Sequence, residues 1–253
     1  MKISANELLT TVGKAFEGLG FAPGDREDAA AMVAWLELHG LNGLAELEKA
    51  LDFLDQETDP RPRTLFRSSG LRVFDAGGAS VLAGGALAVD AGVAMARHVA
   101  LATVRLEHCH NRLLIIGYLA RSASLGVSVL ASWGNARRDP RRYVASLRAG
   151  DGAPTLRAWT TSVSSGDVFD QGLTLVFSRN LDLLPQLHLD EASERVLLSV
   201  EGASLDAAEA ACIEHGITLD DALWQRLGIL ARRVLVAASE QSRRGAGELS
   251  PGD

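Results

Sequence analysis

The sequence is poor in cysteine: among 253 residues only Cys109 and Cys212 are present, far apart in the chain. Secreted proteins that depend on disulfides carry many more cysteines, so we do not expect a disulfide framework. We expect instead that the protein resides in a reducing compartment. No run approaches the ~20 apolar residues of a membrane-spanning helix, and the first residues lack the apolar core of a secretory leader. We therefore expect a cytoplasmic protein that does not bind a membrane.

Basic residues are also in the minority. The chain has 25 Lys and Arg against 32 Asp and Glu, which gives a formal net charge of -7 at pH 7. A negative chain repels the phosphates of nucleic acids and anionic lipids, so neither is expected as a partner. A chain of this length buries roughly 70% of its unfolded surface, which is enough for a full apolar core.

Apolar residues recur at helical spacing through the first part of the chain. Ser4 and Glu7 form a capping-box pattern before the first helix, and Asp25 is predicted to cap the second. The helices predicted in this way cover residues 5–19, 25–40 and 43–55. Together they form a predicted N-terminal helical lobe, residues 1–59, and a proline-containing linker is predicted over residues 58–69.

From Leu71 the pattern changes to short β-rich runs that alternate with helices. Strands are predicted over residues 71–74, 102–106 and 127–133, and helices over 86–99 and 113–124. Because strand and helix alternate, the second and third of these strands are predicted to pair in parallel. A mixed or antiparallel portion follows, with strands over 143–147, 155–163, 172–177 and 195–200, and then helices over 204–215 and 219–238.

The predicted fold class is therefore α/β, a mixed sheet with helices packed on it plus the N-terminal helical lobe. The α/β core with its C-terminal helices is predicted to span residues 70–241. Residues 242–253 form a tail that is expected to fray unless it docks.

The densest polar cluster is the run E-H-C-H-N over residues 107–111, directly after a predicted parallel strand. Open α/β sheets bind ligands at the carboxyl ends of such strands. On a continuing strand His108 and His110 point to one face, so they are the candidate catalytic acid and base. No local motif supplies a third metal ligand, so no metal is predicted, and a nucleophilic Cys109 would need a lowered thiol pKa. A polar loop that binds a small ligand, or histidines with a structural role, is favoured.

Four further residues are candidates for ligand binding: Asn111, Arg112, Asn135 and His39. The planar guanidinium of Arg112 suits a carboxylate. His39 lies at the predicted end of a helix, where the dipole favours a cation, so capping explains it equally well. Gly84 and Gly85 are placed at a predicted helix start, where amides could bind an anion, but no Rossmann or P-loop glycine pattern occurs in the chain.

A second pattern runs through Asn111, Gly117, Tyr118, Ala120, Gly126 and Asn135. It resembles the N-H-F-G-x-x-G-Y-x-A motif, followed by a strand ending in Asn, of the malate and L-lactate dehydrogenase family that uses a non-Rossmann nicotinamide fold. The opening helices through Leu38-His39-Gly40 are also similar to that family. The resemblance implies a related core, a small carboxylate ligand, and NAD(P) as the cofactor of an active member.

Two departures from the family pattern bear on catalysis. The family's R-G-H-x-S-H-G segment carries its catalytic histidine, and the similar segment here, His39 to Gly43, is shorter by two residues and lacks that histidine. Arg112 stands where the family has a second histidine. The resemblance therefore implies a dehydrogenase-like scaffold without the usual proton donor.

The two ends of the chain resemble a bacterial family catalogued as domain of unknown function 3726. The similarity lies in residues 3–8, I-S-A-N-E-L, and in residues 224–247, which end in the specific run S-R-R-G-A-G. This second resemblance implies a bacterial protein of unassigned function.

The favoured interpretation is a small-molecule-binding protein on a dehydrogenase-related scaffold, catalytically altered or inactive. A divergent NAD(P)-dependent oxidoreductase acting on a small 2-oxo or 2-hydroxy acid is one alternative. A non-catalytic subunit of an oligomer, with a homodimer as the simplest case, is another, because such scaffolds associate through symmetric faces.

Overall fold

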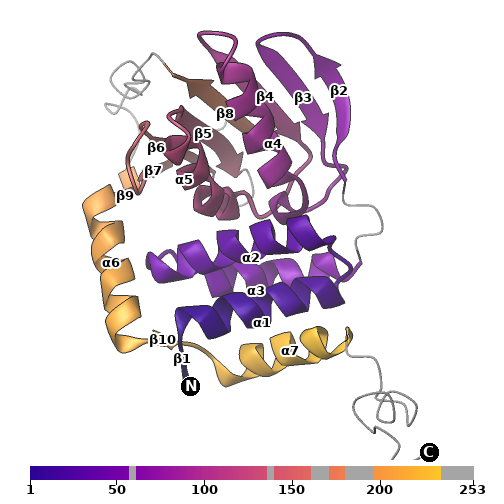
Figure 1. Cartoon of the computed structure of the whole chain (residues 1–253), viewed down its shortest axis with the longest axis vertical. Helices are drawn as coiled ribbons and strands as arrows, with labels where there is room; N and C mark the ends of the chain where they lie inside the picture. Colours follow the sequence, from indigo (N-terminus) through magenta and orange to yellow (C-terminus); the bar gives the residue numbers. More distant parts are fainter. Residues whose placement is uncertain (57–60, 136–139, 161–170, 180–195, 235–253) are drawn as a thin grey trace, which may run out of the picture.

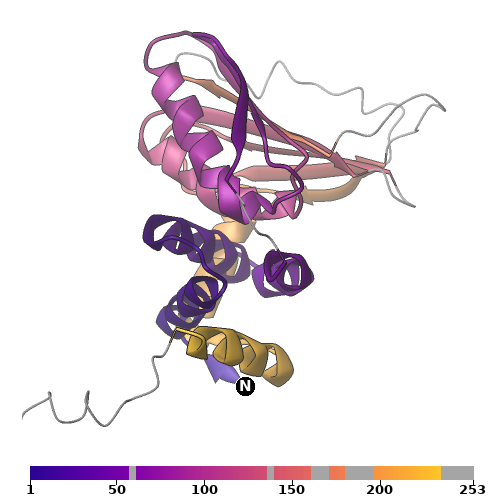
Figure 2. The same cartoon turned by 90° about the vertical axis from the view of Figure 1, so that its right-hand side faces the viewer.

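The computed structural model describes residues 1–56, 61–135, 140–160, 171–179 and 196–234. An eight-stranded mixed sheet lies above a layer of helices, and helices α4 (Val81–Ala96) and α5 (Ile116–Ser124) pack on one face of the sheet (Figure 1). Seen along the edge of the sheet, both helices lie on the same side (Figure 2). The predicted α/β class with an N-terminal helical lobe is confirmed.

The three N-terminal helices form as predicted, with one correction. Helix α1 (Ala5–Gly18) begins with a complete capping box in which Ser4 and Glu7 each accept from the other's backbone amide. Helix α2 (Pro23–Leu38) begins two residues before Asp25, so the predicted cap is wrong: Asp25 lies in the first turn, where its charge favours the helix dipole. Helix α3 (Gly43–Leu54) completes the set.

The strand order is β2-β3-β4-β8-β5-β6-β7-β9. These strands are β2 (Arg63–Arg67), β3 (Leu71–Asp75), β4 (Ala102–Glu107), β5 (Ser128–Asn135), β6 (Arg141–Leu147), β7 (Thr155–Thr160), β8 (Leu173–Ser178) and β9 (Val196–Val200). Strands β3 and β4, which α4 connects, pair in parallel with each other. All other neighbouring strands of this sheet are antiparallel. The later strands, β5 to β9, pair only antiparallel, so the antiparallel alternative predicted for that portion is confirmed, and the sheet as a whole is mixed because of β3 and β4.

The predicted parallel pairing of β4 with β5 is wrong. Strand β8 lies between them and is antiparallel to both, so β4 and β5 point the same way without sharing hydrogen bonds. The alternating sequence pattern fixes the direction of these strands, but a strand from much later in the chain takes the position between them.

The predicted linker over residues 58–69 is also wrong in part. Residues 63–67 form β2, which pairs antiparallel with β3 through a register shift between Thr64 and Phe66. Every residue of β2 is exposed, so the strand lacks the alternation of buried and polar residues that would identify it in a sequence.

Helix α4 begins earlier than its predicted start at Ala86, because Ser80 caps it through the amide of Leu82. The predicted role of Gly84 and Gly85 as anion-binding amides is therefore wrong, since both lie inside the helix. A Cβ on Gly84 would meet Pro62 at 2.4 Å, and one on Gly85 would meet Ile115 at 2.8 Å, so these glycines permit close packing.

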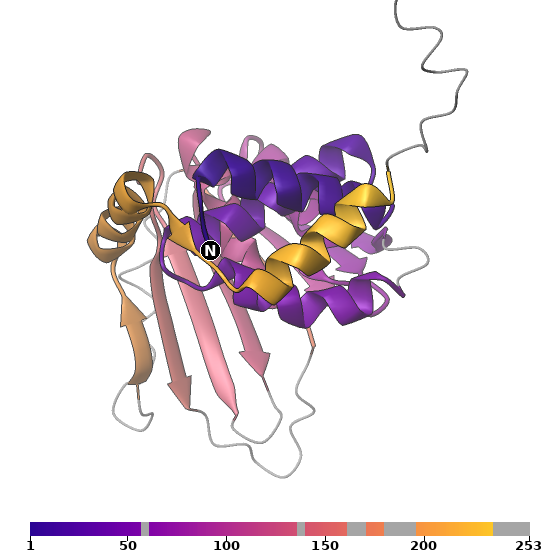
Figure 3. The same ribbon diagram turned by 90° about the horizontal axis from the view of Figure 1, so that it is seen from below.

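The last described elements return to the helical layer. Helix α6 (Gly202–His215) runs along one side of the molecule, the short strands β1 (Lys2–Ile3) and β10 (Ile217–Thr218) pair, and α7 (Asp221–Arg232) packs on α1 (Figure 3). Of the predicted helix over residues 219–238, the part after residue 234 lies outside the described residues, as do residues 161–163, Arg195 and the tail.

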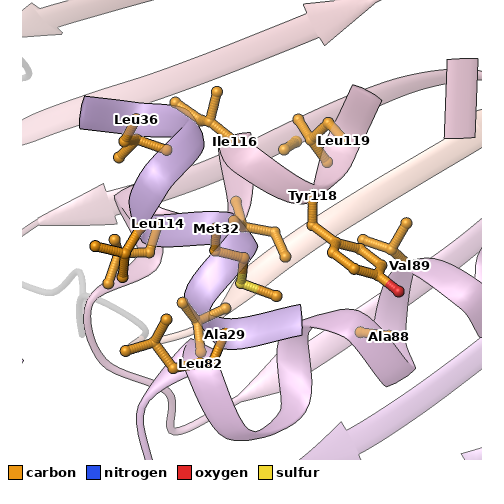
Figure 4. Packing of buried hydrophobic residues seen from close by; sticks show 14 of the residues in the cluster. Ala29, Met32, Leu36, Leu82, Ala88, Val89, Leu114, Ile116, Tyr118 and Leu119 are labelled. Atoms are coloured by element: carbon orange, nitrogen blue, oxygen red, sulfur yellow. The ribbon is translucent and has the colours of Figure 1, made fainter. Parts of the chain in front are cut away.

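One apolar core joins the helical layer to the sheet. Met32 and Leu36 of α2 pack among Leu114, Ile116 and Leu119, which follow β4 in the chain (Figure 4). None of the helices in the described residues is long and apolar enough to span a membrane.

Candidate functional site

The turn between β4 and α5 has an unusual backbone. His108 and Asn111 have φ angles of 50° and 54°, in the left-handed region that favours glycine. Such conformations cost of order 1–3 kcal/mol each and are frequent at functional sites. Their occurrence at both His108 and Asn111 therefore justifies a functional hypothesis for this turn.

Backbone hydrogen bonds hold this turn against the loop between β3 and α4. The amide of Gly78 donates to the carbonyl of His108 at 2.7 Å, and the amide of His110 donates to Ala79 at 3.1 Å. The amide of Val81 in turn donates to His110 at 2.9 Å. The two loops at the carboxyl ends of the parallel strands β3 and β4 therefore form one unit, as the topology predicts.

A carboxylate that sequence analysis did not single out orients His108. Asp75, the last residue of β3, accepts from Gly77 at 2.8 Å and from Arg63 at 2.8 Å, and its Oδ1 lies 2.9 Å from Nδ1 of His108. The hydrogen bond with His108, followed by those from Gly77 and Arg63, lowers the pKa of Asp75 to about 2. Asp75 is therefore ionised at neutral pH and holds the imidazole ring in place.

The two members of this pair differ in exposure. The side chain of Asp75 is 11% exposed, whereas that of His108 is 63% exposed. Within the described part of the chain, Nε2 of His108 has no hydrogen-bond partner. A fixed carboxylate thus presents an imidazole to solvent, an arrangement that can donate or accept a proton or bind an anion. The position of Asp75 at the end of the neighbouring predicted strand was the signal that could have identified it.

His110 is held differently from His108. It forms a parallel bridge with Ser80, and its ring stacks on Phe53 with centroids 6.3 Å apart. Phe53 lies near the end of α3 and is 60% exposed. The helical lobe therefore reaches the turn, through an aromatic residue that the sequence pattern assigned only to a helix.

Arg112 is a bridge between strand ends. Its two terminal nitrogens donate to the carbonyls of Cys109 and Gly134, each at 2.8 Å, and burial lowers its pKa. Because the fork of its guanidinium is committed to backbone, Arg112 fixes the turn relative to β5. Its buried Nε and the buried Oδ1 of Asn111 have no hydrogen-bond partner among the described residues.

Cys109 lies in the core beneath the turn. It is fully buried, its Sγ lies 3.6 Å from the carbonyl of Leu106, and burial raises the pKa of its thiol to about 11. The thiol is therefore protonated at neutral pH, which opposes a nucleophilic role. No group of three metal-ligating side chains gathers within the described ranges.

The last two candidates occupy different places. Asn135 ends β5 next to Gly134 and is exposed, beside the turn. His39 follows α2, is 4% exposed, stacks on Trp35 at 3.7 Å and lies 3.8 Å from Glu209 of α6. His39 precedes the first residue of α3, whereas Phe53, which contacts the turn, lies near the last. Because α3 is about 18 Å long, the two residues lie at opposite ends of it. The structure thus brings His108, His110, Asn111 and Arg112 together, but not His39.

The start of α4 does not fit the phosphates of a dinucleotide. Its first amides are used within the chain: Val81 donates to His110, Leu82 to the hydroxyl of Ser80, and Ala83 to the carbonyl of Ser80. A helix N-terminus binds phosphate through unpaired amides, and these are paired.

Comparisons with known proteins agree with this fold. Residues 3–82 match a family described as protein of unknown function (DUF3726), as the opening of the chain predicts. A search of the curated proteins found no match.

Solved dehydrogenases have the same fold. A dehydrogenase from Sinorhizobium meliloti is similar with a TM-score of 0.67 and 16% identity, over 91% of this chain and 99% of that one. A putative malate/lactate dehydrogenase from E. coli is similar with a TM-score of 0.67 and 13% identity, over 97% of this chain and 98% of that one. Malate dehydrogenase from Pyrococcus horikoshii is similar with a TM-score of 0.68 and 10% identity, over 94% of this chain and 97% of that one. The malate/lactate dehydrogenase-like fold predicted from the motifs is confirmed, and at these identities the likeness concerns fold alone.

Proposed function

We propose that this chain is a small-molecule-binding protein of the cytoplasm that holds a small carboxylate at the turn of residues 108–112 and lacks the usual dehydrogenase histidine. The observation that carries the proposal is the Asp75–His108 pair, an exposed imidazole oriented by a buried carboxylate at the ends of two parallel strands. Ligands of open α/β sheets bind at such strand ends.

The chemistry around His108 suits an anion. A protonated imidazole donates a charge-assisted hydrogen bond to a carboxylate. The guanidinium of Arg63 is a second cation nearby, because it donates to the same Asp75 carboxylate that pairs with His108. Asn135 at the end of β5 supplies an exposed amide group. Arg112, the carboxylate ligand expected from the sequence, instead supports the site by fixing the turn. Malate and lactate, named for proteins of the same fold, are small carboxylates.

A divergent NAD(P)-dependent oxidoreductase for a 2-oxo or 2-hydroxy acid is the second candidate. The specific observation in its favour is again the Asp75–His108 pair, because a carboxylate that orients an imidazole is a common general acid–base device. The paired amides at the start of α4 count against a dinucleotide at that helix. The binding role therefore ranks first.

Thermal shift with a panel of 2-oxo and 2-hydroxy acids tests the proposal. We expect at least one acid to raise the melting temperature of the wild type and of His215→Ala, which removes an exposed imidazole on α6. His108→Ala should lose the shift while folding normally, because its side chain is largely exposed. An unchanged shift in His108→Ala would exclude this turn as the site.

The same samples separate the two candidates. Titration of NADH and NADPH, followed by nicotinamide fluorescence, should show no change if the protein only binds a carboxylate. A saturable blue shift that His108→Ala leaves intact, with turnover that His108→Ala abolishes, would establish the oxidoreductase instead.

A further inference from the structure

Helix α6 connects the sheet to the helical layer and is held by little buried surface (Figure 1). Both of its ends are fixed: Glu201, directly before it, accepts from the hydroxyl of Thr155 in β7 at 3.3 Å, and β10, directly after it, pairs with β1. Between these ends only Leu205 of its 14 residues is buried. A segment with so few buried apolar contacts opens locally at a low cost in free energy, so each additional contact affects how tightly α6 is bound.

His39, which the candidate ligand site leaves unused, lies against this helix. Its side chain is 4% exposed, and its Nδ1 lies 2.7 Å from the carbonyl oxygen of Trp35, one helical turn earlier. A carbonyl oxygen only accepts hydrogen bonds, so Nδ1 carries a proton and donates it. The other ring nitrogen, Nε2, faces the carboxylate of Glu209 on α6 at 3.8 Å.

The protonation state of His39 decides whether this contact is attractive. In the neutral ring Nδ1 holds the single proton, so Nε2 presents a lone pair to the carboxylate and cannot donate to it. In the protonated ring Nε2 is a positively charged donor, which attracts the carboxylate of Glu209. One proton therefore changes the contact between the end of α2 and α6 from unfavourable to favourable.

The neighbours of His39 suit a positive charge on its ring. The ring stacks on the indole of Trp35 with centroids 3.7 Å apart, and an aromatic face attracts a cation. Besides Glu209, the titratable groups here are Glu37 of α2, which accepts from a backbone amide of α3 at 2.9 Å, and Cys212 of α6. Burial, followed by the charge of Glu37, raises the pKa of the Cys212 thiol, so that group stays neutral. Within the described part of the chain neither carboxylate pairs with Lys or Arg, so no other cation competes for them.

We propose that His39 is a proton-operated latch, which holds α6 on the helical layer when its ring is protonated and releases the helix when the ring is neutral. Imidazole changes its charge between about pH 5 and pH 8, a range in which carboxylates stay ionised. The latch is therefore closed at the acid end of this range and opens as the pH rises through it. Close packing assists it, because a Cβ on Gly40 would lie only 3.4 Å from that of Ala208 in α6. The latch does not depend on the proposed ligand.

Amide hydrogen exchange of the full chain tests the latch. After correction for the intrinsic effect of pH on exchange, peptides of α6 should be about tenfold more protected at about pH 5.5 than at about pH 8, because a hydrogen bond to a charged group contributes roughly that factor or more. Glu209→Gln, which changes a side chain that is 42% exposed and keeps its size, should lose this difference. The control His215→Ala removes an exposed imidazole from the same helix and should keep it.

The fluorescence of Trp35 reports the proton itself, because an imidazolium quenches an indole on which it stacks. The difference in emission between the wild type and Trp35→Phe should fall as the pH is lowered from about 8 to about 5. The same difference measured in a His39→Gln background should not change with pH. Protection of α6 that does not rise on acidification, that rises equally in Glu209→Gln, or a constant emission of Trp35 would each overturn the latch.

Discussion

At the residue scale, Asp75 is the centre of the candidate site. It receives hydrogen bonds from Arg63 and Gly77 and pairs with His108, so three segments depend on its charge. Arg112 shows a second feature of this scale: a residue type suited to a ligand is used to bind backbone. Residue identity indicates which chemistry is available, and the hydrogen-bond partners decide how it is used.

The lowered pKa of Asp75 predicts a specific dependence of stability on pH. Its pKa is about 2 in the folded chain against an ordinary 3.8, so the folded state favours the ionised form. That stabilisation is fully present above about pH 4 and is lost as the pH falls toward 2. Urea unfolding at several pH values should show a steeper loss of stability in this range for the wild type than for Asp75→Asn.

A matched control for this measurement is Asp151→Asn, which changes an exposed carboxylate in a turn. It should keep the wild-type slope. Parallel curves for the wild type and Asp75→Asn would show that the Asp75 hydrogen bonds do not stabilise the fold.

At the element scale, glycines, which have no side chain, determine how closely a helix approaches the sheet. A Cβ on Gly92 of α4 would lie 2.0 Å from the ring of Phe177 in β8, whose side chain is fully buried. Glycine costs a helix interior up to about 1 kcal/mol relative to alanine, so it is retained here for packing.

Gly92→Ala is therefore expected to destabilise the protein. Overpacking costs about 1–3 kcal/mol, which exceeds the gain in helix propensity of up to about 1 kcal/mol. Gly24→Ala in the first turn of α2, where nothing lies within 4 Å of the new Cβ, should be neutral or stabilising. Chemical denaturation of both variants provides the comparison, and equal midpoints would contradict the packing argument.

At the scale of the whole molecule, the helical layer and the sheet share one apolar core. Met32 of α2 is fully buried, and its backbone lies against Gly117 of α5, where a Cβ would meet the Met32 carbonyl at 2.5 Å. The division into residues 1–59 and 70–241 remains a prediction, and the shared core favours cooperative unfolding of the two parts.

Met32→Ala tests this cooperativity. The substitution should cost about 2–5 kcal/mol, as for other buried methionines. Amide hydrogen exchange should then accelerate together in peptides from α1–α3 and from β4 and β5. Acceleration confined to α1–α3 would show that the lobe unfolds alone, and would support two independent domains.

Local signals in the sequence determined the N-terminal helices, the α/β class and the polar turn after β4. The capping box at Ser4 and Glu7, helical apolar spacing and the histidine run all act over a few residues, so one sequence can reveal them. The family motifs predicted the dehydrogenase-like fold for the same reason, since each is a short run of residues.

Only the tertiary structure decided the position of β8 between β4 and β5, the pairing of β2, and the partners of His108 and Arg112. Each depends on residues distant in the chain, such as Asp75 for His108 and Gly134 for Arg112. Strand pairing and side-chain hydrogen bonds are selected by the packing of the whole core, and no local pattern encodes that choice.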